Sequence, residues 1–225
     1  MLNAFDGKVG IIQMKEHTKG FLIAIEGIDG SGKTTLTKII QERLVNEGKD
    51  VFALPSGGFD SNEVEAQLRK IVIAENSGVT RNTETLIYFA SLAQKVEQYI
   101  LPALYADKIV IVDRFILSTF VFAHYMFKQD RKLTEGILQF ASQSIIPDFT
   151  FLCDLEAEVA YSRLICRGKE LSRREKQGET FMNAMRGWYL KEIANSSKRY
   201  EIIRTDKVTI EEMEEYINAL EQYVY

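Results

Sequence analysis

The chain has 225 residues, of which 46% are hydrophobic and 27% charged, a composition typical of a soluble globular domain with one substantial core. Its formal net charge of −4 argues against a general nucleic-acid binder, because such proteins carry excess positive charge. No apolar run approaches membrane-spanning length, and Cys153 and Cys166 fit neither a metal site nor a disulfide framework. We therefore expect a cytoplasmic protein without a membrane or nucleic-acid partner.

Residues 1–19 contain polar residues throughout and lack the apolar core of a signal peptide. We expect them to form an N-terminal extension that precedes a single domain over 20–225. Within that domain, short continuous apolar runs predict buried strands at 21–25, 51–54, 108–112, 149–152 and 200–204. Longer amphipathic segments predict helices at 33–47, 62–75, 83–105, 115–127, 156–166, 175–195 and 209–223.

The alternation of strands and helices predicts an α/β fold with a parallel sheet between two layers of helices. In such sheets, ligands bind beyond the carboxyl ends of the strands. The residues that directly follow each predicted strand are therefore the first candidates for chemistry.

The first predicted strand leads into the segment 27–34, Gly-Ile-Asp-Gly-Ser-Gly-Lys-Thr, and a helix follows. This is the complete Walker A pattern in its strand–loop–helix setting, so it predicts a nucleotide-phosphate site. Backbone N–H groups and the helix N-terminus would face phosphate oxygens, Lys33 would reach the terminal phosphates, and the Thr34 hydroxyl would bind Mg²⁺. The predicted site comprises Gly27, Asp29, Gly30, Ser31, Gly32, Lys33, Thr34 and Thr35.

Asp113 and Arg114 follow the predicted strand 108–112. A carboxylate at this position can hold Mg²⁺ through water, and an arginine beside it can bind an anionic acceptor. The alternative for the pair is a structural ion pair without a functional role.

A basic stretch interrupts the helical pattern near residues 166–176. Its members are Arg163, Arg167, Lys169, Arg173, Arg174 and Lys176. We interpret the segment as a mobile lid whose arginines, Arg167 and Arg173 above all, stabilise a transferring phosphoryl group and exclude water. The alternative is an ordinary solvated helix face.

These residues resemble the thymidylate kinase family over nearly the whole chain, 21–223. The resemblance rests on the cradle 26–35, the motif Asp113-Arg114-Phe115-x-x-Ser118, Gln94, the segment 102–104 and the lid from Arg163 onward. It implies a P-loop kinase fold with a five-stranded parallel sheet, commonly a homodimer. It also implies ATP and Mg²⁺ as co-substrates and a deoxynucleoside monophosphate as the phosphoryl acceptor.

The resemblance also implies an acceptor site. Asp29 matches an acid near the acceptor's sugar and phosphate, and Arg114 matches the arginine that binds its phosphate. Tyr88 aligns with an aromatic residue that stacks on the pyrimidine, Thr119 with a residue at the base edge, and Phe122 with one near the sugar's 2′ position. The complete set of predicted substrate-binding residues is Asp29, Tyr88, Leu92, Arg114, Ser118, Thr119 and Phe122.

The chain departs from the family pattern on the acceptor side. Leu54 and Pro55 replace an Arg-Glu pair, and Ser91 and Leu92 replace an Asp-Arg pair whose arginine bonds the thymine carbonyl; residues 121–123 also differ. A buried polar edge left without its partner costs about 1–3 kcal/mol. Two interpretations follow: a diverged thymidylate kinase with a compensating contact from Thr119 or Gln94, or an altered acceptor specificity.

The predicted reaction is in-line transfer of the ATP γ-phosphoryl group, in which positioning and charge stabilisation dominate. An acceptor phosphate is already anionic, so neither His17 nor His124 is assigned as a general base. Two alternatives remain open from the sequence. One is a kinase for a nucleoside or a non-nucleotide acceptor, and the other is a nucleotide-binding regulatory module without transfer activity.

Overall fold

A computed structural model describes residues 20–56, 64–74, 78–196 and 200–209, and beyond these residues 212, 213, 215–218 and 220. The predicted N-terminal extension, 1–19, lies outside the described residues. So does much of the predicted helix 209–223, although the described positions 212, 213, 215–218 and 220 are helical.

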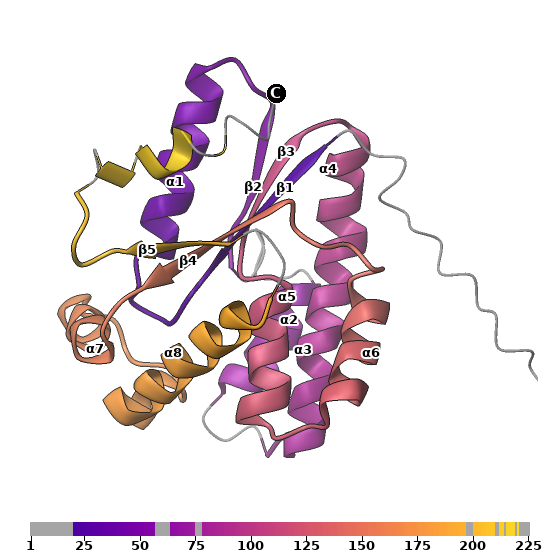
Figure 1. Cartoon of the computed structure of the whole chain (residues 1–225). Helices are drawn as coiled ribbons and strands as arrows, with labels where there is room; N and C mark the ends of the chain where they lie inside the picture. Colours follow the sequence, from indigo (N-terminus) through magenta and orange to yellow (C-terminus); the bar gives the residue numbers. More distant parts are fainter. Residues whose placement is uncertain are drawn as a thin grey trace, which may run out of the picture.

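Five parallel strands form one sheet in the order β2-β3-β1-β4-β5. The strands are β1 (Phe21–Glu26), β2 (Val51–Leu54), β3 (Ile109–Asp113), β4 (Phe149–Asp154) and β5 (Tyr200–Arg204). All five predicted strands are present within one or two residues of their expected bounds. The predicted α/β fold with a five-stranded parallel sheet and helices on both faces is therefore confirmed (Figure 1).

Alternate residues of the central strands face opposite helical layers, as the pleat of a strand requires. Leu22 and Val110 pack towards the layer that contains α3 (Arg81–Lys95). Ile23 and Ile111 pack towards α1 (Lys33–Asn46), which lies on the other face (Figure 1). Apolar residues on both faces explain why these strands appear as unbroken hydrophobic runs in the sequence.

The long predicted helix at 83–105 is one helical column with a change of register. It comprises α3, a π-helical turn (Val96–Ile100) and α4 (Leu101–Tyr105), with Pro102 in the first turn of α4. Proline lacks an N–H and clashes with the preceding turn of an α-helix, and the wider π turn accommodates it. A second π turn (Val121–Met126) follows α5 (Ile116–Phe120) in the segment predicted as 115–127.

The remaining helices are α2 (Val64–Ile73), α6 (Arg131–Ala141), α7 (Ala157–Cys166), a 3₁₀ turn (Glu175–Gln177) and α8 (Gly178–Ala194). No element was predicted for the segment that forms α6. Its N-terminal signal is Asp130, whose side chain accepts a hydrogen bond from the Leu133 N–H at 2.9 Å. None of the described helices combines the length and the apolar character that crossing a membrane requires.

Candidate active site

The loop after β1 forms the cradle that the Walker A pattern predicts. Gly30 has φ of 78°, and a Cβ at this position would lie 2.5 Å from the Ala160 carbonyl oxygen, so only glycine fits between the loop and α7. Lys33 is buried, and its Nζ donates to the Ile28 carbonyl at 2.8 Å. Thr205, after β5, closes the loop from the other side by donating to the Ser31 carbonyl at 2.9 Å.

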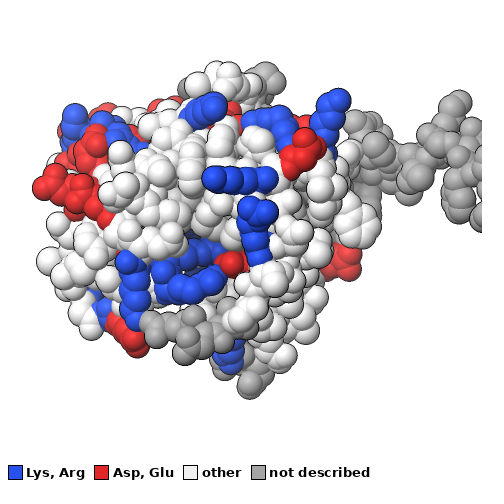
Figure 2. Space-filling view, turned by 90° about the horizontal axis from the view of Figure 1, so that it is seen from below, with Lys and Arg blue, Asp and Glu red and all other residues white. Residues whose placement is uncertain are grey.

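A cavity that opens over this loop carries a strong excess of positive charge. Its described lining includes five basic side chains, Lys33, Arg69, Arg114, Arg163 and Arg167, against two acidic ones, Asp29 and Asp113. Figure 2 shows Lys and Arg side chains gathered around this hollow. Burial and the nearby Arg114 lower the pKa of Lys33, so the cluster is electrostatically costly without a bound anion. A polyphosphate is a ligand with the charge to offset that cost.

One orphaned oxygen at the cradle fits a hydrated divalent cation. Asp113 Oδ1 is buried and has no hydrogen-bond partner among the described residues. Thr34 lines the same cavity as Asp113, so a hydroxyl and a carboxylate face one space. At phosphate sites, Mg²⁺ prefers a small number of oxygen ligands from the protein, and water molecules complete its coordination shell. No group of three or more His, Cys, Asp or Glu side chains suited to a metal occurs in the described part of the chain.

Arg114 joins the cradle to a second cavity. Its backbone adopts a left-handed conformation with φ of 66°, which is costly for a residue with a side chain. The guanidinium donates to Asp29 Oδ1 at 2.6 Å, to the Gly27 carbonyl at 2.6 Å and to the Tyr189 hydroxyl at 3.0 Å. The strained backbone is thus held by contacts that direct the cation towards the cradle.

Asp29 is the acidic partner in this arrangement. Burial by the surrounding atoms would raise its pKa, but Arg114 and Lys33 outweigh that effect and hold the pKa below its ordinary value. The carboxylate is therefore ionised at neutral pH. It balances part of the positive charge at the junction of the two cavities.

Glu26, at the end of β1, fixes the position of the Asp113-Arg114 loop. Its buried carboxylate accepts from the Phe115 N–H at 2.9 Å, the Ser118 N–H at 3.2 Å and the Ser118 hydroxyl. Burial raises the pKa of Glu26, and the hydrogen bonds from Ser118 and Phe115 lower it in part. The Ser118 hydroxyl also lies 2.7 Å from that of Tyr189, so a continuous polar network supports Arg114.

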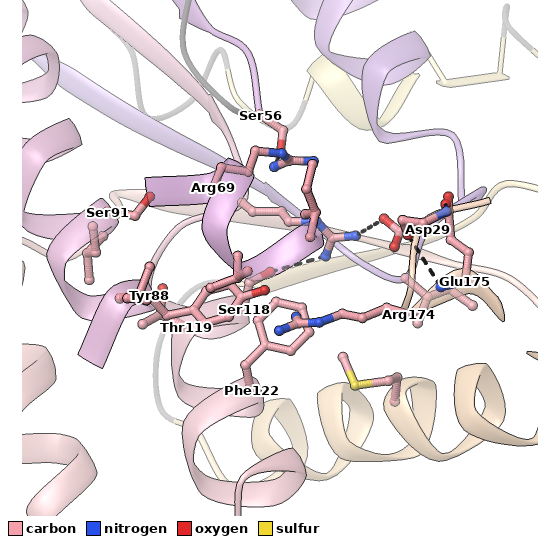
Figure 3. A pocket seen from close by; sticks show the side chains of 18 of the residues that line it. Asp29, Ser56, Arg69, Tyr88, Ser91, Ser118, Thr119, Phe122, Arg174 and Glu175 are labelled. Carbon is pink, nitrogen blue, oxygen red and sulfur yellow. Dashed lines mark hydrogen bonds and ion pairs between the residues drawn. The ribbon is translucent and has the colours of Figure 1, made fainter. Parts of the chain in front are cut away.

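The second cavity, which we call the acceptor cavity, has a volume of about 320 Å³, within the range of small-molecule sites. All seven predicted substrate-binding residues line it: Asp29, Tyr88, Leu92, Arg114, Ser118, Thr119 and Phe122. Tyr88 and Phe122 form an aromatic wall with ring centroids 5.2 Å apart. In Figure 3, Tyr88 and Ser91 lie at the end of this cavity opposite Asp29.

The predicted lid arginines occupy different places in this conformation. Arg167 lines both cavities and donates to Glu175 at 2.9 Å. Arg173 lines neither cavity, and it bonds the Glu84 carboxylate and the Val72 carbonyl instead. Its predicted position over the phosphates therefore requires a different lid conformation from this one.

Arg174, which was not singled out for the site, lies inside the acceptor cavity (Figure 3). Its guanidinium carbon is 4.6 Å from the Tyr88 ring centroid and 4.7 Å from that of Phe122, and it bonds Glu84 at 2.7 Å. A planar cation covers the aromatic wall on which a nucleobase would stack. The lid and a bound base therefore compete for the same surface.

The sequence also gave no reason to select Arg69, Glu65 or Lys95, which all line the acceptor cavity. Arg69 donates to the Ser56 hydroxyl at 3.0 Å and lines both cavities, so it supplies positive charge near the place where Leu54 replaces the family arginine. Each of the three is a charged residue on an amphipathic helix, where charge normally indicates a solvated face. Burial in the folded chain distinguishes Glu65 and Lys95, whereas Arg69 is exposed and is distinguished by its place in the wall of both cavities.

Enzymes that move a phosphoryl group between two nucleotides need a donor site and an acceptor site within one cleft. Here Asp29, Ser56, Arg69, Arg114 and Arg167 form a wall that the two cavities share. The fold and this cleft define a P-loop phosphotransferase of the nucleoside monophosphate kinase class. The sequence profile of the thymidylate kinase family matches residues 25–217, and the chain belongs to that family.

Individual relatives agree with this assignment. The thymidylate kinase of Thermoanaerobacter pseudethanolicus is 33% identical over 207 residues, which cover 92% of this chain and all of that protein. The thymidylate kinase of Caldanaerobacter subterraneus subsp. tengcongensis is 33% identical over 89% of this chain and 98% of its own. That of Rhodopirellula baltica is 32% identical over 91% of this chain and 81% of its own.

Proposed function

We propose that this protein transfers the γ-phosphoryl group of ATP to dTMP, which yields ADP and dTDP. The observation that carries the proposal is the shared wall of the two cavities, because a polyphosphate bound on the cradle would lie next to an acceptor phosphate bound at Arg114. An oxygen of the acceptor phosphate attacks the γ-phosphorus while the bond to the β-phosphate bridging oxygen breaks. Family membership supports dTMP as the acceptor.

The donor half uses the cradle and its cations. Backbone N–H groups of the loop and Lys33 hold the β- and γ-phosphates of ATP, and Arg163 and Arg167 contribute further positive charge from α7 and the lid. Thr34 and Asp113 would hold Mg²⁺, which neutralises charge on the donor phosphates when bound. Preorganised positive charge is the main contribution that a protein makes to this reaction.

The acceptor half positions a phosphate that is already anionic. Arg114 binds it, Arg69 adds charge, and Tyr88 stacks on the base after Arg174 has moved from the aromatic wall. The reaction requires no proton abstraction from a hydroxyl group. The depressed pKa of Asp29 agrees with this, because a carboxylate that is paired with arginine is a poor proton acceptor.

An acceptor panel tests the proposal. ADP release is measured with ATP, Mg²⁺ and each deoxynucleoside monophosphate, together with 5-substituted pyrimidine nucleotides and thymidine itself. We expect dTMP to give the highest kcat/KM, and mass spectrometry should identify dTDP as the second product. Preferential use of thymidine would indicate a nucleoside kinase, and ATP binding without ADP release across the panel would indicate a regulatory module.

Leu92, which stands where the family pattern has an arginine, leads to a separate prediction. Leu92 is buried, with 3% of its surface exposed, and it packs in the core beside the acceptor cavity. Leu92→Arg should therefore lower the free energy of unfolding by about 1–3 kcal/mol through overpacking, without raising kcat/KM for dTMP. Thermal denaturation and ADP release measure the two effects, and Leu92→Met is the volume-matched control. A rise in dTMP turnover at unchanged stability would contradict the prediction.

We also propose that the protein binds ATP and Mg²⁺ in the cytoplasm and acts as a homodimer. The dimer is supported by apolar side chains left on the surface of α6, where Phe140 is 82% exposed and Leu133 54% exposed. Apolar side chains at such spacing on one helix often mark a protein interface. The exposed, unpaired thiol of Cys166 is compatible with a reducing compartment.

A further inference from the structure

Three polar side chains, Glu65, Ser91 and Lys95, meet in the wall of the acceptor cavity. Glu65 lies on α2, and Ser91 and Lys95 lie one turn apart on α3. The Ser91 hydroxyl donates to Glu65 Oε1 at 2.9 Å, and Lys95 Nζ lies 3.7 Å from the same oxygen. We call these residues the Glu65 cluster.

The Glu65 cluster has hydrogen-bonding capacity that the described residues do not use. The Glu65 side chain is only 2% exposed, yet its Oε2 has no hydrogen-bond partner among the described residues. At 3.7 Å the Lys95–Glu65 contact is an ion pair but too long for a hydrogen bond, so the ammonium group retains donors. A buried carboxylate oxygen without a partner is costly, which indicates that a ligand completes the cluster.

The electrostatic surroundings of Lys95 act in both directions. Burial lowers the pKa of Lys95, Glu65 raises it, and Arg69 lowers it further. Glu65 is thus the neighbour that most favours the ammonium form. The cluster as a whole offers a ligand one acceptor beside one donor in a low-dielectric setting, where a matched pair of hydrogen bonds discriminates strongly.

The position of the cluster identifies the part of the ligand that it contacts. Ser91 and Tyr88 lie at the end of the acceptor cavity opposite Asp29 (Figure 3). Because Arg114 bonds Asp29, the phosphate-binding cation stands at the Asp29 end. A nucleotide with its phosphate at Arg114 therefore directs its base towards Tyr88 and the Glu65 cluster.

We propose that the Glu65 cluster recognises the N3–H and O4 edge of the acceptor pyrimidine, an inference that rests on the proposed phosphorylation of dTMP. Glu65 Oε2 accepts the hydrogen bond from N3–H, and Lys95 Nζ donates to the adjacent carbonyl O4. Ser91 holds the carboxylate in place through Oε1. Glu65 and Lys95 thereby supply the base contact that Leu92 lacks.

The two compensating residues considered from the sequence are less suited to this role. Gln94 donates to Gln98 at 2.8 Å and does not line the cavity. Thr119 lines the cavity, but its hydroxyl hydrogen is used on the Phe115 carbonyl at 3.0 Å. Thr119 therefore retains only lone pairs, and a lone pair cannot bond a carbonyl oxygen.

Equilibrium binding of acceptor nucleotides without ATP tests the proposal by calorimetry. The ligands are dTMP, 3-methyl-dTMP, which lacks the N3–H, and dCMP, which lacks the N3–H, the O4 carbonyl and the 5-methyl group. Each lost hydrogen bond to a charged group is expected to raise Kd at least about tenfold. The wild-type chain should therefore prefer dTMP to both analogues by about this factor or more.

The double variant Glu65→Met/Lys95→Met separates recognition from structure. It removes both charges at similar volume, and such replacement of a buried ion pair is often neutral for stability. We expect it to fold with an unchanged melting temperature and to bind the three ligands with similar, weakened affinity. Lys132→Met and Glu158→Gln, on exposed positions of α6 and α7, are controls that should retain the wild-type preference.

Three results would overturn the assignment. The first is that the wild-type chain binds 3-methyl-dTMP or dCMP as tightly as dTMP or more tightly. The second is that the double variant keeps the wild-type preference for dTMP. The third is that dTMP does not bind at all. If the double variant does not fold, the comparison of analogues on the wild-type chain still decides. Binding is scored without turnover, so an inactive chain that discriminates these ligands would refute the proposed reaction but not the recognition site.

Discussion

Replacing Lys33 by methionine should reduce kcat/KM for ATP-dependent dTMP phosphorylation by on the order of 10²–10³-fold. Lys33 is buried at the base of the cradle, where its ammonium group now bonds the Ile28 carbonyl at 2.8 Å. Methionine keeps most of the volume and removes the charge, so the loop should retain its shape. The missing cation is one that would stabilise charge developing on the transferred phosphoryl group.

Steady-state ADP release and ATP binding measure this effect. Lys38→Met, on an exposed position of the same helix, is the matched control and should behave like the wild-type chain. Melting temperatures confirm that both variants fold. A Lys33→Met enzyme within tenfold of wild-type kcat/KM would remove Lys33 from the catalytic assignment.

Arg114→Ala should raise the KM for dTMP and lower kcat while leaving ATP binding largely unchanged. Arg114 bonds Asp29 at 2.6 Å and would bind the acceptor phosphate, and a hydrogen bond to a charged group contributes about 1.5–3 kcal/mol. That range corresponds to roughly 10- to 100-fold in kcat/KM. Part of the loss arises because Asp29 would then face the incoming acceptor phosphate without its neutralising cation.

The acceptor dependence of the rate and separate measurements of ATP affinity distinguish the two halves of the site. Arg43→Ala removes an arginine from an exposed ion pair with Glu47 on α1 and should change neither quantity. Arg114→Lys should recover only part of the lost activity, because a single ammonium group cannot reproduce the fork of donors. An unaltered response to dTMP in Arg114→Ala would exclude Arg114 from the acceptor site.

Sequence patterns predicted most of the strands and helices whose own residues show a clear hydrophobic period or a helix-capping residue. The strands were predicted because apolar residues cover both faces of a buried parallel sheet. The helix α6 was missed although its segment carries two helix signals, the Asp130 cap and apolar residues that recur at helical spacing from Leu133 to Phe140. The π turns before Pro102 and after Phe120 were also missed, since hydrogen-bond register is not visible in residue types.

The lid shows a different limit of sequence analysis. Arginines at 167, 173 and 174 are equally basic in the sequence, and any of them could face a phosphate. In the structure Arg167 lines both cavities, Arg173 bonds Glu84, and Arg174 covers the Tyr88 ring. The positions of Arg173 and Arg174 depend on a carboxylate and aromatic rings supplied by α3 and the segment after α5. Such partners are distant in sequence, so no local pattern reports them.

The sequence by itself determined the Walker A loop, the five strands in their order along the chain, and the Asp113-Arg114 motif, because each is encoded within a few consecutive residues. Only the tertiary structure decided how the acceptor side is built. Helix packing buries Glu65 and Lys95 beside the half-buried Ser91, and it brings Arg69 to the wall shared by both cavities. A buried charged group must find a partner, whereas an exposed one is solvated by water. Whether a charged side chain is buried depends on how the helices and strands pack, and the residue type alone does not decide it.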